Sequence, residues 1–200
     1  MLPLDLTLFY AVNADAATPP AVVDVARWVS QQLPIAVGGV VAGGWVVGTQ
    51  AQRRELATAL AAMALAWISV QLLRHAVPAP RPAQLGIGVQ WIEHAARAGF
   101  PSMHAAGAFA LAASLTMGKA APPRRLLLMA GAAWAVAIAM AWSRVCLGVH
   151  FPSDVLAGVI TGLICAWVAH AMVQQVQRLN WPRRFSAYWS HRALPWARHR

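Results

Sequence analysis

The chain has 200 residues, of which 59% are hydrophobic and only 11% are charged, and its mean hydropathy is +0.52. Such a chain is too apolar for an ordinary soluble domain, so we predict an integral membrane protein. The net charge of +10 would suggest a nucleic-acid partner in a soluble chain, but cytoplasmic loops of membrane proteins also collect Lys and Arg. Because basic residues are interleaved with aromatic residues only in the C-terminal tail, we expect no nucleic acid as a partner.

The N-terminal region, residues 1–32, is predicted to be an interfacial segment. Apolar residues recur at helical spacing over Pro20–Leu33, and polar residues, Ser30 among them, occupy the other side. This pattern favours an amphipathic helix on the membrane surface over a sixth span. A helix packed against the rest of the protein fits the pattern equally well.

Five segments are long and apolar enough, about 17 residues or more, to cross a hydrocarbon core about 30 Å thick. They are Leu33–Gln50, Leu56–Leu73, Ser102–Lys119, Leu126–Trp142 and Asp154–Val173. Gly and Ala are frequent in these segments, as they are in spanning helices that pack closely. We therefore predict one all-α membrane domain over residues 1–200, with five transmembrane helices, or six as the alternative count, and an N-terminal amphipathic helix.

The distribution of basic residues predicts the orientation of the bundle. Eleven of the 16 lie in the loop between the first two spans, in the loop between the third and fourth spans, and in the tail of residues 174–200. With five spans these segments share one side, which the positive-inside rule assigns to the cytoplasm, and the tail is expected to lie on anionic lipid. The remaining five fall on the opposite side: Arg27, Arg74, Arg81, Arg97 and Arg144.

Three segments on that outer side carry residues suited to chemistry. The first is the long loop Arg74–Pro101, and a loop of that length in a small domain is usually functional. The second opens the third span, and the third links the last two spans. In chain order the candidates are Arg74 and Arg81, then Ser102 and His104, then Arg144, His150 and Asp154.

These residue types suit attack on a phosphate. Three arginines offer planar, always charged donors that match phosphate oxygens, and Ser102 follows a proline at a helix start, where unpaired N–H groups bind anions. Asp154, four residues after His150, would lie beside the imidazole in a helical turn and leave the other ring nitrogen as nucleophile. His104 is suited to protonate the leaving oxygen. Since Asp154 is the only acidic residue after Glu93, we expect a reaction without a metal or another cofactor.

With these residues the chain resembles the type 2 phosphatidic acid phosphatase superfamily, whose three segments read Lys-x6-Arg-Pro, Pro-Ser-Gly-His and Ser-Arg-x5-His-x3-Asp. The match runs from Arg74 to Asp154 and departs from the pattern at Arg74, in place of lysine, and at Met103, in place of glycine. The resemblance implies a phosphohistidine mechanism with His150 as nucleophile, Asp154 as its orienting partner and His104 as general acid. It also implies that the phosphate is held by Arg74, Arg81, Ser102 and Arg144.

Over its whole length the chain is most similar to bacterial undecaprenyl-diphosphatases of the bacitracin-resistance type, through Leu8–Asn13, Pro101–Ala108 and Gly148–Leu156. This similarity implies hydrolysis of undecaprenyl diphosphate in the bacterial inner membrane, with the site facing the periplasm, the C-terminus in the cytoplasm, and lipids as partners. The alternatives are a phosphatase for phosphatidylglycerophosphate, phosphatidic acid or lipid A, a lipid phosphotransferase, and a non-catalytic anion-binding membrane protein. The oligomeric state is not predicted.

Overall fold

The computed structural model describes residues 3–93, 97–120 and 122–192. Over these residues the chain is helical and contains no strand, which confirms the all-α prediction. The elements are α1 (Pro3–Val12), α2 (Pro20–Gln31), α3 (Leu33–Val47), α4 (Gln50–Ala76), the short 3₁₀ helix η1 (Pro82–Leu85), α5 (Met103–Met117), α6 (Pro123–Cys146) and α7 (Pro152–Arg192).

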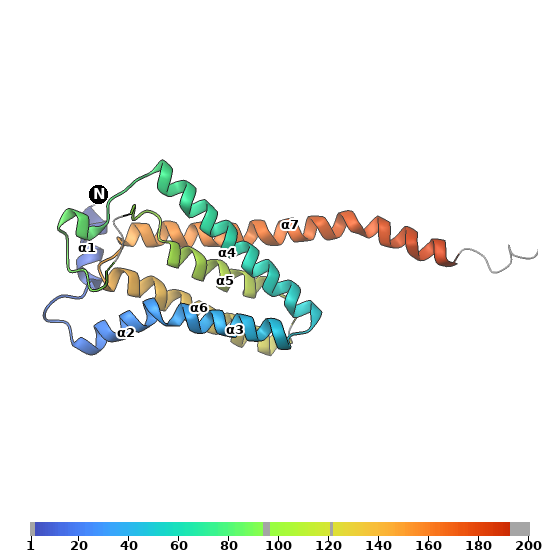
Figure 1. The fold of residues 1–200 in the computed structure, drawn as a ribbon, viewed down its shortest axis with the longest axis horizontal. Coiled ribbons are helices and arrows are strands. Elements are labelled where there is room, and N and C mark those ends of the chain that lie inside the picture. The colour runs from blue at the N-terminus through green and yellow to red at the C-terminus, as the bar shows by residue number, and fades with distance from the viewer. Residues whose placement is uncertain (1–2, 94–96, 121, 193–200) are drawn as a thin grey trace, which may run out of the picture.

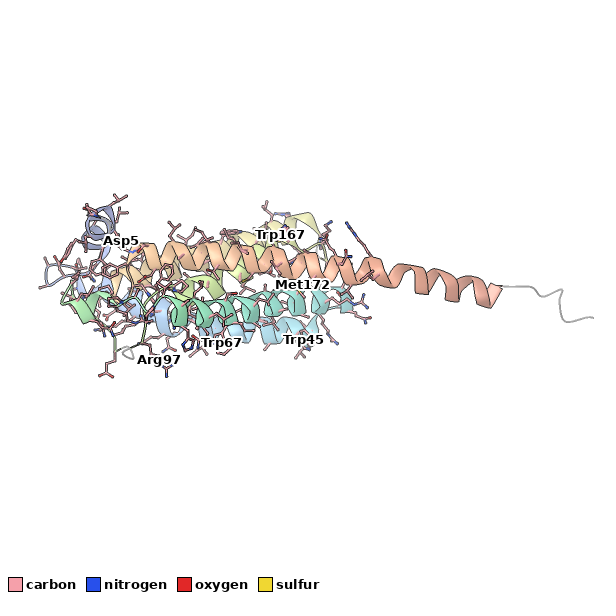
Figure 2. All side chains as sticks on the ribbon, turned by 90° about the horizontal axis from the view of Figure 1, so that it is seen from above. Asp5, Trp45, Trp67, Arg97, Trp167 and Met172 are labelled. Atoms are coloured by element: carbon pink, nitrogen blue, oxygen red, sulfur yellow. The ribbon has the colours of Figure 1, made fainter. Side chains whose placement is uncertain are left out.

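Three of the described helices are long and apolar enough to cross a membrane: α4, the part of α6 over Leu127–Cys146, and the part of α7 over Pro152–Leu179. The helices α3 and α5 have 15 residues each, which corresponds to about 22 Å of helix. They are therefore shorter than the predicted spans, and the count of five stays a prediction. Large apolar side chains such as Trp67 and Trp167 lie exposed on the flanks, as expected of a surface that faces lipid (Figure 2).

The centre of the bundle is α5, which packs against α4, α6 and α7. Its buried surface consists largely of alanines, and they meet further alanines such as Ala62 and Ala66 on α4 and Ala166 on α7. Gly158 and Gly162 of α7 lie directly against the backbone of α5. Small residues let the helix backbones approach closely, which is how spanning helices associate without a hydrophobic driving force.

The amphipathic helix α2 packs against α6 and buries Val23, Ala26 and Val29. After Gln32 it leads into α3, and the two helices follow one another along the same side of the bundle (Figure 1). The structure therefore shows α2 packed against the protein, and its position at the membrane surface stays a prediction. The sequence pattern was wrong for Ser30, which is 3% exposed although it was assigned to the polar side.

Different helices and connections lie at the two ends of the bundle. One end gathers α1, the end of α4, η1 and the adjoining ends of α5, α6 and α7, whereas the α3–α4 and α5–α6 connections lie at the other end (Figure 1). The three segments predicted to carry the chemistry therefore meet at one end, as expected. Helix α7 continues past the opposite end to Arg192, and the side chains of residues 180–192 and all of residues 193–200 lie outside the described part, so the lipid-bound tail stays a prediction.

Candidate active site

A tight turn between α6 and α7 places His150 beside Asp154. Gly148 adopts a φ of +69°, and a Cβ there would lie 2.1 Å from the carbonyl oxygen of Val89, so only glycine fits. Nδ1 of His150 lies 3.4 Å from Oδ2 of Asp154, and both side chains are almost fully buried. The sequence suggested a helical turn between them, but α7 begins at Pro152, after His150. The pair forms because Asp154 turns back over the helix start, where Oδ2 also accepts a hydrogen bond of 3.0 Å from the N–H of Phe151.

Arg81 reaches this turn from the loop after α4. Its Nη1 donates to the carbonyl oxygen of Val149 at 2.8 Å and lies 3.3 Å from Nε2 of His150, while its Nε donates to the carbonyl oxygen of Arg97 at 3.0 Å. A guanidinium has no acceptor, so Nε2 of His150 carries the lone pair and Nδ1 carries the proton that faces Asp154. Burial, and next the charge of Arg74, lowers the pKa of Arg81 to about 10, which leaves the side chain cationic at neutral pH.

The start of α5 forms another wall of the site. Ser102 is the N-cap residue and is fully buried, and its N–H donates to the carbonyl oxygen of Asp154 at 2.9 Å. Its hydroxyl does not cap the helix and has no hydrogen-bond partner among the described residues. His104 lies in the first turn of α5 and is exposed. The hydroxyl of Ser102 and the first-turn N–H groups together offer donors to an anion.

Two more arginines come from the last turns of α4 and α6. Nη2 of Arg74 donates to the carbonyl oxygen of Pro101 at 3.2 Å, and its Nε has no partner among the described residues. Arg144 is 2% exposed, and its Nη1 donates to the hydroxyl of Ser30. Its Nε and Nη2 are also without partners in the described part of the chain. Buried guanidinium groups with uncommitted donors are costly unless an anion binds them, so this end of the bundle is suited to an anion.

The N-terminal helix α1 also contributes to this end, which the sequence reasoning did not find. Asp5 accepts hydrogen bonds from the backbone N–H of Ser153 at 2.9 Å and from its hydroxyl at 2.7 Å, at the first turn of α7. Asn13 binds both backbone groups of Val89 and the carbonyl oxygen of Cys146. Asp5 and Ser153 are 148 positions apart, and no spacing in the sequence signals such a pair.

All seven predicted site residues thus lie at one end of the bundle. They come from the ends of α4, α5, α6 and α7, from the loop after α4 and, for His150, from the turn between α6 and α7. A sequence profile of the PAP2 superfamily matches residues 55–178, a range that contains every one of the seven. The chain belongs to the PAP2 superfamily. Together with the three long apolar helices, this membership identifies it as a membrane protein.

Similar proteins agree with this membership. The chain is 30% identical over 192 residues to the protein named "Putative undecaprenyl-diphosphatase YbjG" of Escherichia coli (strain K12), covering 96% of this chain and 94% of that protein. It is 32% identical over 149 residues to the decaprenylphosphoryl-5-phosphoribose phosphatase of Mycolicibacterium smegmatis, covering 74% of this chain and 77% of that one.

Two solved structures share the fold of this PAP2 chain. Aquifex aeolicus LpxE matches with a TM-score of 0.68 and 23% identity, over 85% of this chain and 96% of that one. A PAP2-type phosphatidylglycerolphosphate phosphatase of Bacillus subtilis matches with a TM-score of 0.66 and 18% identity, over 86% of each chain. At these identities the likeness concerns the fold alone.

Proposed function

We propose that this protein is a membrane lipid phosphatase that hydrolyses a lipid diphosphate, undecaprenyl diphosphate, through a phosphohistidine intermediate. The observation that carries the proposal is the oriented imidazole of His150. Its Nδ1 faces Asp154, and its Nε2 lies beside the guanidinium of Arg81 at a buried anion site. An anion site alone would require the arginines but not the aligned His150–Asp154 pair.

In the proposed reaction Nε2 of His150 attacks the terminal phosphorus, and the bond from phosphorus to the lipid-side oxygen breaks as the P–N bond forms. His104 gives its proton to that leaving oxygen. Asp154 stabilises the positive charge that develops on the imidazole. A water, deprotonated by His104, then attacks the phosphorus, breaks the P–N bond, and releases inorganic phosphate.

The remaining site residues bind the phosphoryl group in this mechanism. Arg74, Arg81 and Arg144 neutralise the charge on its oxygens, and the hydroxyl of Ser102 and the N–H of Met103 donate hydrogen bonds. Arg81 already lies 3.3 Å from Nε2, so a phosphate oxygen that displaces this contact would come next to the attacking nitrogen. Arg74 in place of the superfamily's lysine keeps the charge but offers a planar donor pair.

Undecaprenyl diphosphate is proposed as the substrate because of the similarity to YbjG over almost the whole chain. The orientation follows from charge: Arg53, Arg54 and Lys119 lie near the ends of helices at the end of the bundle opposite the site. By the positive-inside rule that end faces the cytoplasm and the site faces the periplasm, where the released diphosphate carrier would be recycled.

The test is phosphate release by the purified protein in detergent, with a chelator present, from undecaprenyl diphosphate, phosphatidylglycerophosphate, phosphatidic acid and lipid A. We expect the diphosphate to be cleaved fastest, and His150→Ala and His104→Ala each to reduce its turnover at least about 10³-fold. His75→Ala, an exposed histidine at the end of α4, serves as the matched control and should retain full activity. Full activity in His150→Ala would exclude the nucleophile, and label passed to a second lipid instead of water would make the protein a phosphotransferase.

A further inference from the structure

Arg144, one of the two fully buried arginines of the site, is held by a residue outside the region that the superfamily profile matches. Arg144 is 2% exposed, and its Nη1 donates a hydrogen bond to the hydroxyl of Ser30 on α2. The matched region begins at residue 55, so α1 and α2 precede it. The contact joins positions 114 apart in the chain.

Ser30 is itself buried at the contact between α2 and α6. It is 3% exposed and lies beside Val29 and Ala26, which pack on the same side. A hydroxyl in such an apolar contact costs free energy unless it forms a hydrogen bond, and the guanidinium of Arg144 supplies that bond. The buried hydroxyl of Ser30 and the buried guanidinium of Arg144 therefore each satisfy a hydrogen bond of the other.

The geometry of the Arg144 guanidinium determines which of its donors remain available to a phosphate. Arginine has five N–H donors, divided between Nε, Nη1 and Nη2, and the edge formed by Nε and Nη2 can bind two oxygens of one phosphate. Ser30 occupies the Nη1 side, and both Nε and Nη2 lack a partner among the residues that the structure describes. The carbonyl oxygen of Arg144 accepts a hydrogen bond from Val149, next to His150, so the residue is also fixed through its backbone.

We propose that Ser30 is a positioning residue of the phosphate site: its hydroxyl fixes the rotation of the Arg144 guanidinium so that the Nε–Nη2 edge stays directed to the phosphate. This inference rests on the proposed phosphatase reaction and adds a residue of α2 to its machinery. Without the hydroxyl, the guanidinium rotates about its last bonds, and the phosphate loses one of two aligned donors.

The experiment compares Ser30→Ala with Ser30→Thr, which restores the hydroxyl, and with Ser114→Ala. Ser114 is a matched control because it is also a 3% exposed serine, but its hydroxyl has no partner among the described residues. Three quantities are measured in detergent: kcat/KM for undecaprenyl diphosphate, the affinity for orthovanadate from its stabilisation against thermal unfolding, and the Tm without vanadate.

We expect Ser30→Ala to lower kcat/KM and vanadate affinity about tenfold each, since one hydrogen bond to a charged group is lost. Its Tm without vanadate should also fall, and by more than that of Ser114→Ala, because Nη1 of the buried Arg144 loses its partner. Ser30→Thr should recover most of the losses in kcat/KM and in vanadate affinity. Wild-type vanadate affinity in Ser30→Ala would overturn the role of Ser30, while hydrolysis by the wild-type protein would leave the proposed function standing. If the wild-type protein binds vanadate more tightly than Ser30→Ala but cleaves no lipid, the proposed reaction fails and the positioning role holds. A wild-type protein that does not bind vanadate would overturn both.

Discussion

The contact between α7 and α5 fixes the position of Ser102, and a substitution of Gly158 on α7 tests how closely the two helices must approach. A Cβ at Gly158 would lie 2.5 Å from the carbonyl oxygen of Ser102 and 3.1 Å from Cβ of Ala105. Ordinary Cβ contacts begin at 3.4 Å, so in Gly158→Ala the start of α5 must move by about 1 Å. The atoms in the way are two backbone atoms and the Cβ of Ala105, so no flexible side chain can absorb the shift.

We expect two effects of Gly158→Ala. Overpacking of the helix contact should lower the free energy of unfolding by about 1–3 kcal/mol. A shift of about 1 Å in Ser102, whose N–H is bonded to the carbonyl oxygen of Asp154, should lower kcat/KM on the order of 100-fold. Gly162→Ala, where the Cβ would lie 2.4 Å from the carbonyl oxygen of Ala106, should cost similar stability but less activity, because it acts one turn further from the site.

Thermal unfolding and phosphate release in detergent measure both effects, with Gly131→Ala on α6 as the control. A Cβ at Gly131 meets nothing within 4 Å, so alanine there should leave activity unchanged and raise stability by up to about 1 kcal/mol through helix propensity. If Gly158→Ala had the activity and stability of Gly131→Ala, the close approach of α7 to α5 would not be what positions Ser102.

Three further substitutions test individual side chains at the site end of the bundle. Asp5→Ala removes the acceptor of two hydrogen bonds from Ser153 and should lower the free energy of unfolding by about 1 kcal/mol, measured by thermal unfolding. An unchanged Tm would contradict the role of α1 in holding α7. Arg97→Ala removes an exposed charge at the site end of the bundle (Figure 2), so kcat/KM should fall a few-fold at low salt. The loss should recover near 1 M salt, because the Debye length there is about 3 Å. A loss independent of salt would indicate direct contact with substrate. Arg81→Lys keeps the charge but loses the planar donor set that binds Val149, so kcat/KM should fall about tenfold or more. A kcat/KM of Arg81→Lys equal to that of the wild-type protein would show that charge alone suffices.

Local patterns were enough to predict that the candidate site residues meet at one end of the bundle. The segments with Arg74 and Arg81, with Ser102 and His104, and with Arg144, His150 and Asp154 are short and carry their own spacing, and the apolar runs between them predict helices that return each segment to the same side. The boundaries were less accurate: α4 begins at Gln50, six residues before the predicted span, because Thr49 and Gln52 cap a polar first turn. Hydropathy detects the lipid-crossing part of a helix and not its polar ends.

The amino-acid sequence is sufficient to predict a bundle of apolar helices, an asymmetric distribution of basic residues, and a set of residues suited to phosphate chemistry. The contacts between distant segments become visible only in the folded chain: Arg81 with His150, 69 positions apart, Ser30 with Arg144, and Asp5 with Ser153. The physical reason is that hydropathy and helical periodicity act over a few turns of one helix. A hydrogen bond between distant segments depends on how whole helices pack, and here that packing is set by the close approach of small residues on α5 and α7 and by the burial of α2 against α6.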